Sequence, residues 1–244
     1  DSEAFGTLEK DRAEMFLEGI NSVLQIWKQD PPYNINGKHW VISTKNTLMP
    51  DIGQGYMTKP LQKPHPPIIV TAVAPFSKGV TEAAARGWDI ISADIIMPQW
   101  VASHWIKYVE GCNRINRSVD TNNWRVAKAV FVADDLNTAR EYALGKDSPY
   151  IFYFKQLFTK FVAMGKLDLF KTFRDQPDDE VKFEDICKKL IIWGTPDKVK
   201  EDLISFKEEV GDFGTLLYAG MDWTNPELAK RSMILTRENV IDKI

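Results

Sequence analysis

The chain has 244 residues, with 31 basic and 34 acidic side chains and a formal net charge of −3. This near-neutral balance argues against nucleic acid as the main partner, because phosphate backbones are bound by basic faces. The two cysteines, Cys112 and Cys187, are too few for a disulfide framework and favour a reducing, cytoplasmic location. The sequence has no run of 18 apolar residues and no signal peptide, so we expect no membrane partner.

The first part of the chain is predicted to contain one helix and few other regular elements. Apolar residues recur at three- and four-residue steps over residues 8–27, which predicts an amphipathic helix that ends before a pair of prolines. The dipeptide Asn36-Gly37 predicts a small hairpin over residues 33–44. Residues 45–63 are rich in Gly, Pro, Thr and Lys, and we expect a long surface excursion there.

Strand and helix patterns alternate from residue 65 onward. Continuous apolar runs that suit buried strands occur at residues 65–74, 88–95, 124–134 and 213–219. Helical patterns occur at residues 77–87, 98–117, 135–144, 148–173, 179–189, from Pro196 onward, and at 225–243. Strand followed by helix, repeated along the chain, indicates parallel strands with right-handed crossovers. Two α/β architectures fit: a doubly wound sheet and part of a (β/α)8 barrel.

The turn after the first of these strands is the most informative candidate site. Its sequence is Val73-Ala74-Pro75-Phe76-Ser77-Lys78-Gly79. Free backbone N–H groups at a helix N-terminus, together with the helix dipole, favour an anion such as phosphate. Ser77 would add a hydroxyl, Lys78 a positive charge, and Gly79 room for close approach. The alternative is structural, with Ser77 only an N-cap and Lys78 only a surface charge. No GxGxxG or GxxxxGK[ST] motif supports a dinucleotide fold or a P-loop.

Other residues with reactive side chains are scattered along the sequence. His39, His65 and His104 lack the spacing of a metal site, so we expect no metal and interpret them as structural or solvent-facing imidazoles. Cys112 is expected to pack in the core rather than act as a nucleophile. Carboxylates at the ends of predicted strands could serve catalysis or cap the following helix; these are Asp94, Asp134 and Asp222. We assign no catalytic residue.

Aromatic side chains are concentrated over residues 150–173 and recur after the last predicted strand. Such a concentration is typical of a core, but its bulk exceeds what one helix seam needs. An aromatic lid over an apolar substrate or ring system is therefore the alternative. Trp223 either lines a pocket or covers the end of the sheet. As candidate substrate contacts we take Phe154, Phe158 and Trp223.

The order and spacing of several segments resemble the bacterial-luciferase-like flavin-dependent monooxygenases, closest to the limonene- and diketocamphane-type branch. The segments are DSEAFG at 1–6, GKHW at 37–40, KPHPPIIVTA at 63–72, IIWGTPDKV at 191–199, VGDFGTLLYAGMDW at 210–223 and RSMILTRENV at 231–240. The resemblance implies a (β/α)8 TIM barrel with a lid insertion, of which residues 1–244 would supply strands 5–8 as a single domain. Because the chain starts at Asp1, we expect its N-terminal third, with the family's catalytic histidine, to be missing.

The same resemblance implies FMN as the cofactor, delivered in reduced form by a separate flavin reductase, and O2 as the co-substrate for oxygenation of a small apolar compound. The positions that match the family's phosphate-binding loop are Val73, Ala74, Ser77, Lys78 and Gly79. Aromatic residues of the lid would exclude water from the reaction, and the family habit is a homodimer. Three alternatives stay open: a non-catalytic flavin-binding protein, an oxidoreductase that uses the deazaflavin coenzyme F420, and a phosphate-binding barrel enzyme without flavin.

Overall fold

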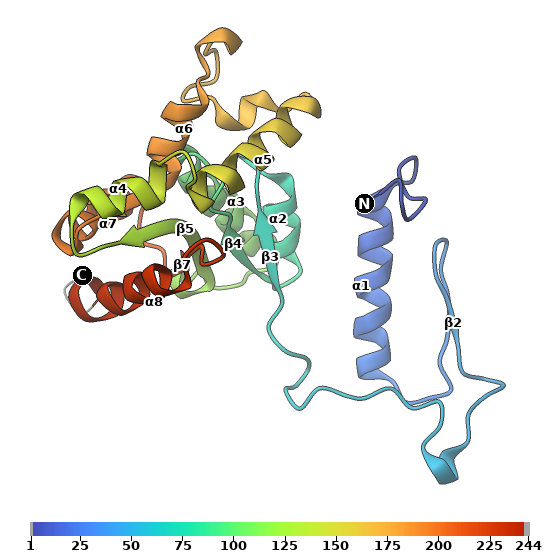
Figure 1. Cartoon of the computed structure of the whole chain (residues 1–244). Helices are drawn as coiled ribbons and strands as arrows, with labels where there is room; N and C mark the ends of the chain where they lie inside the picture. The colour runs from blue at the N-terminus through green and yellow to red at the C-terminus, as the bar shows by residue number, and fades with distance from the viewer. Residues whose placement is uncertain (1, 242–244) are drawn as a thin grey trace. The chain divides into compact units, whose positions relative to one another are not determined.

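The computed structural model describes residues 2–241, which divide after Pro67 into two compact units (Figure 1). The prediction of a single domain over residues 1–244 stays a prediction. Asp1 and residues 242–244 lie outside the described part, and so do the first position of the DSEAFG segment and the end of the predicted helix 225–243. Across residues 2–241, none of the helices is both long enough and apolar enough to cross a membrane.

The first unit consists of a helix and a hairpin joined to irregular chain. Helix α1 spans Arg12–Lys28, and the antiparallel strands β1 (Asn34–Asn36) and β2 (Val41–Ser43) form the predicted hairpin. The helix begins later than predicted, because the side chain of Asp11 caps it by accepting a hydrogen bond from the Glu14 N–H at 2.9 Å. A single 3-10 turn, Pro50–Ile52, interrupts the excursion that follows.

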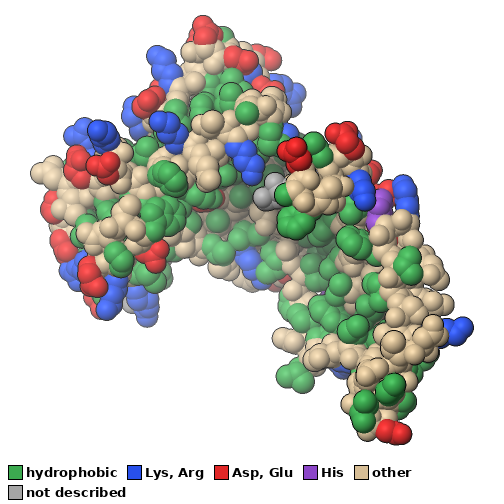
Figure 2. Space-filling model, turned by 45° about the vertical axis from the view of Figure 1, so that its right-hand side comes forward, with side chains coloured by type: hydrophobic (Ala, Val, Ile, Leu, Met, Phe, Trp, Pro, Cys, Tyr) green, Lys and Arg blue, Asp and Glu red, His purple; other side chains and the backbone are tan. Residues whose placement is uncertain are grey.

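One carboxylate ties the hairpin turn to α1. The side chain of Glu18 accepts hydrogen bonds from the backbone N–H groups of Lys38, His39 and Trp40, at 3.0, 2.9 and 2.7 Å. Apolar side chains nevertheless gather on the surface of this unit (Figure 2), where Trp40 and α1 residues line a hollow of about 470 Å³. The unit therefore keeps an apolar surface around α1.

The second unit is built on a parallel sheet of five strands. They are β3 (Ile69–Ala72), β4 (Asp89–Ser92), β5 (Trp124–Val132), β6 (Ile191–Gly194) and β7 (Thr215–Ala219). Strand β5 is central: it pairs with β4 near its start, with β7 along Arg125–Ala129 and with β6 along Ala129–Val132. Among residues 68–241 the sheet stays open and does not close into a barrel.

Helices cover this sheet, as Figure 1 shows. They are α2 (Lys78–Ala85), α3 (Pro98–Arg114), α4 (Leu136–Leu144), α5 (Pro149–Ala163), α6 (Phe183–Leu190), α7 (Pro196–Val210) and α8 (Pro226–Leu235), which continues as a π-helical turn over Thr236–Val240. Short 3-10 turns occur at Thr121–Asn123, Leu167–Phe170 and Asp178–Glu180. The predicted alternation of strands and helices is thus confirmed.

Strand β5 separates two parts of the hydrophobic core. Val126 and Val130 belong to a cluster with α2, α3 and α7, whereas Ala129 and Phe131 belong to a cluster with α4, α5 and α6. Successive side chains of a strand point to opposite faces, so both faces of β5 are covered. This explains the continuous apolar run in its sequence.

Helices α2 and α3 pack with their backbones nearly in contact at Gly111. A Cβ atom at Gly111 would overlap the carbonyl oxygen of Thr81 and the Cβ of Ala84. Only the absence of a side chain allows this approach. The position of α2 is therefore fixed by a close contact with α3.

Three elements of the second unit differ from the sequence prediction. Strand β6 is absent from the sequence prediction, because its four residues follow α6 without an intervening turn and resemble a connection to the next helix. The predicted helix over 148–173 ends at Ala163, because Gly165 adopts a left-handed conformation with φ +67°. Strand β3 begins later than predicted, after Pro66 and Pro67, which have no N–H to donate to a sheet.

Candidate functional site

The loops that follow the strands of a parallel sheet meet at one edge, where α/β enzymes carry their sites. In this sheet they are the turn after β3 at residues 73–77, the segment 93–97 after β4, residues 133–135 after β5, Thr195 after β6 and residues 220–225 after β7. Most of the predicted site residues lie in or beside these loops.

The turn after β3 presents unpaired amides to solvent. Helix α2 begins at Lys78, and the Val80 N–H donates to the Ser77 carbonyl at 3.2 Å. Among residues 2–241, the structure gives the N–H groups of Ser77, Lys78 and Gly79 no acceptor, as is usual for a first helical turn. Ser77 occupies the predicted N-cap position, but its side chain makes no capping hydrogen bond. The hydroxyl is therefore available to a ligand.

Contacts with α3 shape this turn. Phe76 adopts a left-handed backbone conformation with φ +51°, which is uncommon for a bulky residue. Its N–H donates to Ser103 Oγ at 2.9 Å, and that hydroxyl donates to the Trp100 carbonyl at 2.6 Å. The Phe76 ring also meets the Trp100 ring edge-on, with 6.3 Å between centroids. The left-handed conformation of Phe76 is thus stabilised by the hydrogen bond of its N–H and by the packing of its ring.

A buried histidine braces the same turn. His104 Nε2 lies 2.9 Å from the Ala74 carbonyl, and its Nδ1 lies 2.8 Å from Ser92 Oγ. The Ala74 carbonyl can only accept, so Nε2 carries the proton, and Nδ1 of the neutral ring accepts from the Ser92 hydroxyl. That hydroxyl in turn accepts from the Trp124 Nε1–H at 3.0 Å. Burial lowers the pKa of His104, so the imidazole is neutral. His104 is a structural residue, in agreement with the sequence interpretation.

The turn has room for a group that approaches α2 from solvent. Lys78 and Gly79 are exposed, and Ser77 is half-buried. A Cβ on Gly79 would meet only Ser77 Oγ, at an ordinary 3.4 Å, so packing within the protein does not require glycine there. Free amides, a free hydroxyl, a lysine and an unobstructed backbone together fit a phosphate group.

The three carboxylates at strand ends have different surroundings. Asp94 is partly buried and accepts a 3.4 Å hydrogen bond from Tyr153, and desolvation raises its pKa. Asp134 forms a two-pronged ion pair with Arg231, at 2.9 and 2.6 Å. Asp222 is exposed. The helices that follow are capped instead by Asp135 and Asn225, so capping is not the role of Asp134 or Asp222.

The candidate substrate contacts are not brought together. Phe154 is 2% exposed, and Phe158 packs between Phe170 and Phe183 with centroid distances of 5.2 and 5.5 Å. Trp223 is 54% exposed and borders a hollow of about 490 Å³ beside Phe152. Substrate binding by Phe154, Phe158 and Trp223 stays a prediction.

The other candidate residues from the sequence are buried or make contacts within the protein. Cys112 is fully buried in the core, as predicted. His39 lies 3.0 Å from a Glu14 carboxylate oxygen, and His65 Nδ1 lies 2.8 Å from the Pro66 carbonyl. Within residues 2–241, no group of three or more potential ligand side chains could bind a metal ion. The sequence does not indicate that Ser103 and His104 contact the turn, because no local pattern shows that α3 packs beside it.

Comparisons with known proteins find that the chain is similar to a monooxygenase. No family model matches it. It is 23% identical over 246 residues to 3,6-diketocamphane 1,6-monooxygenase of Pseudomonas putida, a match that covers 98% of this chain and 64% of that protein. The chain thus spans less than two thirds of this relative. Because the relative is a diketocamphane monooxygenase, the resemblance predicted from the sequence is confirmed.

Solved structures support the same fold. The oxygenating constituent of 3,6-diketocamphane monooxygenase from Pseudomonas putida, in complex with FMN, matches with a TM-score of 0.77 and 22% identity over 96% of this chain and 64% of that chain. Monooxygenase RslO1 from Streptomyces bottropensis matches with a TM-score of 0.69 and 17% identity over 99% of this chain and 64% of that one. The predicted fold class, an α/β structure with the parallel strands of a luciferase-like barrel, is therefore confirmed.

Proposed function

We propose that the protein is an FMN-dependent monooxygenase that uses reduced flavin and O2 to oxygenate a small apolar ketone, aldehyde or terpene. The observation that carries the proposal is the turn after β3, with its unpaired amides at Ser77, Lys78 and Gly79. It lies in a chain whose fold matches that of a monooxygenase bound to FMN. The oxygenase activity is a proposal for the whole protein, of which this chain matches 64%.

In this proposal the residues of the turn bind the phosphate of FMN. The amides of residues 77–79 and the Ser77 hydroxyl would donate hydrogen bonds to phosphate oxygens, while the Lys78 ammonium would offset part of their charge. Val73 and Ala74 would line the approach, and Gly79 would allow the phosphate close to the backbone. When bound, reduced FMN supplies the electrons that activate O2. The His104 hydrogen bond to Ala74 positions the turn before the ligand arrives.

The remaining partners follow from the same proposal. A separate flavin reductase would deliver reduced FMN. Phe154, Phe158 and Trp223 would contact the apolar substrate and exclude water, which requires that substrate binding bring the three side chains together. We also propose a cytoplasmic location and a homodimer. The cytoplasmic location is supported by two free, buried cysteines, Cys112 and Cys187, which are normal in a reducing compartment.

Turnover of the whole protein tests this function. With a flavin reductase, NADH, FMN and O2, we expect oxygen from 18O2 to enter a bicyclic or monocyclic terpene ketone, detected by mass spectrometry. The matched control omits the reductase. Tight FMN binding without any oxygenated product across ketones, aldehydes and terpenes would instead support a non-catalytic flavin-binding protein.

A second candidate function uses coenzyme F420 in place of FMN. Two F420-dependent enzymes have the same fold, a secondary alcohol dehydrogenase with a TM-score of 0.55 and a tetrahydromethanopterin reductase from Methanopyrus kandleri with a TM-score of 0.58. Both scores are lower than the 0.77 of the FMN complex, so FMN is the better-supported cofactor. Parallel titrations with FMN and F420 separate the two functions, and tighter binding of F420 would contradict our proposal.

A further inference from the structure

A lysine lies buried in the middle of the central strand of the sheet. Lys128 of β5 is 2% exposed, and its ammonium nitrogen Nζ donates a 2.7 Å hydrogen bond to the carbonyl oxygen of Lys189 at the end of α6. The same nitrogen lies 4.7 Å from the centroid of the Phe206 ring on α7. Among residues 2–241, no ion pair joins Lys128 to a carboxylate. A buried lysine without an ion-pair partner is rare in folded proteins.

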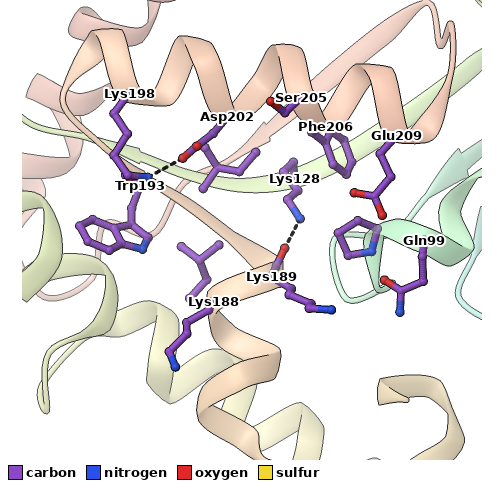
Figure 3. Close-up of a pocket in the computed structure, with 13 residues that line it drawn as sticks. Gln99, Lys128, Lys188, Lys189, Trp193, Lys198, Asp202, Ser205, Phe206 and Glu209 are labelled. Atoms are coloured by element: carbon purple, nitrogen blue, oxygen red, sulfur yellow. Dashed lines mark hydrogen bonds and ion pairs between the residues drawn. The ribbon is translucent and has the colours of Figure 1, made fainter. Parts of the chain in front are cut away.

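This lysine borders a cavity of about 370 Å³, which Figure 3 shows. Ile191, Trp193, Phe206 and Pro98 supply apolar walls, but polar and charged groups make up more of the lining, Gln99 and Glu209 among them. The volume is in the range of sites for small molecules. None of the residues that line the cavity belongs to the turn at 73–79, so the cavity is separate from that turn.

The charged groups around Lys128 do not offset the cost of burying its protonated amine. Glu209 on α7 and Asp94 after β4 favour the charged amine, but desolvation outweighs them and lowers the pKa of Lys128 to about 7. Of the other charges at the cavity, Lys198 pairs with Asp202 on α7, and Lys188 and Lys189 are exposed on α6. At neutral pH, Lys128 is therefore neutral far more often than an ordinary lysine, whose neutral form is about 1 in 2,500.

A neutral amine in this position is a nucleophile. It has two hydrogens and one lone pair, and the hydrogen bond to Lys189 uses one hydrogen. Because Lys128 lines the cavity, the lone pair can attack a carbonyl group that reaches Nζ from there. Lysines desolvated in apolar pockets form Schiff bases with carbonyl compounds in this way. Figure 3 shows the Glu209 carboxylate beside the same hollow, where it can accept a hydrogen bond from a bound group.

We propose that the cavity between β5, α6 and α7 binds a small aldehyde or ketone, and that Lys128 attaches it reversibly as an imine. The amine nitrogen attacks the carbonyl carbon to give a carbinolamine. The carbinolamine then loses its oxygen as water, so that the C=O bond is replaced by a C=N bond and both amine protons leave the nitrogen. No atom changes its redox state, and water reverses the reaction. This site does not depend on the proposed oxygenase function.

Reductive trapping tests this site on the unmodified protein. The protein is exposed briefly to low concentrations of benzaldehyde and sodium cyanoborohydride at pH 7, and modified lysines are counted by peptide mass spectrometry. We expect Lys128 to be modified at least tenfold more than the exposed lysines Lys155 and Lys230. Modification of Lys128 no greater than that of these two lysines would overturn the proposal.

A variant that fills the cavity shows whether the folded site is what reacts. Ser205 lies at the cavity but is exposed, so Ser205→Trp should occupy the space without disturbing the core. Its folding is checked by circular dichroism and thermal melting. We expect modification of Lys128 to fall at least fivefold in this variant, with Lys155 and Lys230 unchanged. Undiminished modification would mean that Lys128 reacts outside the cavity, and would also refute the proposal.

Discussion

Replacing Ser77 and Lys78 together by alanine tests the proposed phosphate site most directly. The Ser77 hydroxyl makes no capping bond to α2, and Lys78 is exposed, so the double change leaves the fold intact. The unpaired amides of the first turn also remain. What FMN loses is one hydroxyl hydrogen bond and one nearby positive charge.

The expected loss is moderate because the amides stay. A hydrogen bond to a charged group contributes about 1.5–3 kcal/mol, and an exposed ionic contact at most about 1 kcal/mol. Allowing for partial replacement by water, we expect FMN binding to weaken by about 1–3 kcal/mol. This corresponds to about a 5- to 150-fold rise in Kd.

Quenching of flavin fluorescence measures this effect with an internal reference. FMN and riboflavin share the same ring system and differ by the phosphate, so the double variant should weaken FMN binding and leave riboflavin binding unchanged. Lys230→Ala, which removes an exposed lysine from α8, is the matched charge control. An unchanged FMN Kd, or an equal loss for both ligands, would show that the phosphate does not lie at this turn.

Three further predictions concern the same part of the fold. Gly79→Val should weaken FMN binding tenfold or more, because the added side chain blocks close approach of the phosphate. The melting temperature should stay within about 2 °C, since a Cβ there meets only Ser77 Oγ at 3.4 Å. A large loss of stability would indicate that Gly79 has a packing role instead. Burial lowers the pKa of His104 in the folded protein. Below about pH 6.5 this histidine is therefore protonated in the unfolded chain but stays neutral in the folded one. The free energy of unfolding should therefore fall between pH 7 and 5, and urea titrations of His104→Gln should show a shallower fall than the wild type; equal slopes would contradict this. Gly111→Ala should destabilise the protein by about 1–3 kcal/mol in urea, because the added Cβ overlaps α2, and an unchanged midpoint would refute the close contact.

The sequence predicts most of the α/β pattern, because long elements have strong local signals. The apolar run of β5 is continuous since both its faces are covered, and Pro196 marks the start of α7. Strand β6 has no such signal. Its four residues form a strand only because β5 extends beyond β4 and offers free backbone groups along Ala129–Val132. That partner is distant in sequence, so no local pattern indicates it.

The sequence predicts where the candidate site lies, but not which distant residues stabilise it. A strand followed by a serine and a helix with a glycine in its first turn are local features, and the structure gives Ser77, Lys78 and Gly79 free amides. Lys78 and Gly79 are also exposed. The contacts that shape the turn come from α3, through Ser103 and His104. Likewise, a lysine in the middle of an apolar strand is visible in the sequence, but the cavity beside Lys128 depends on how α6 and α7 pack.

The close approach of α2 and α3 at Gly111 has a consequence for the proposed phosphate site. The helix whose first turn carries the free amides packs so closely against α3 that a side chain at Gly111 would overlap Thr81 and Ala84. A larger residue at Gly111 would therefore have to displace α2. If the phosphate of FMN binds at the first turn of α2, such substitutions should change FMN affinity without replacing any residue of the turn.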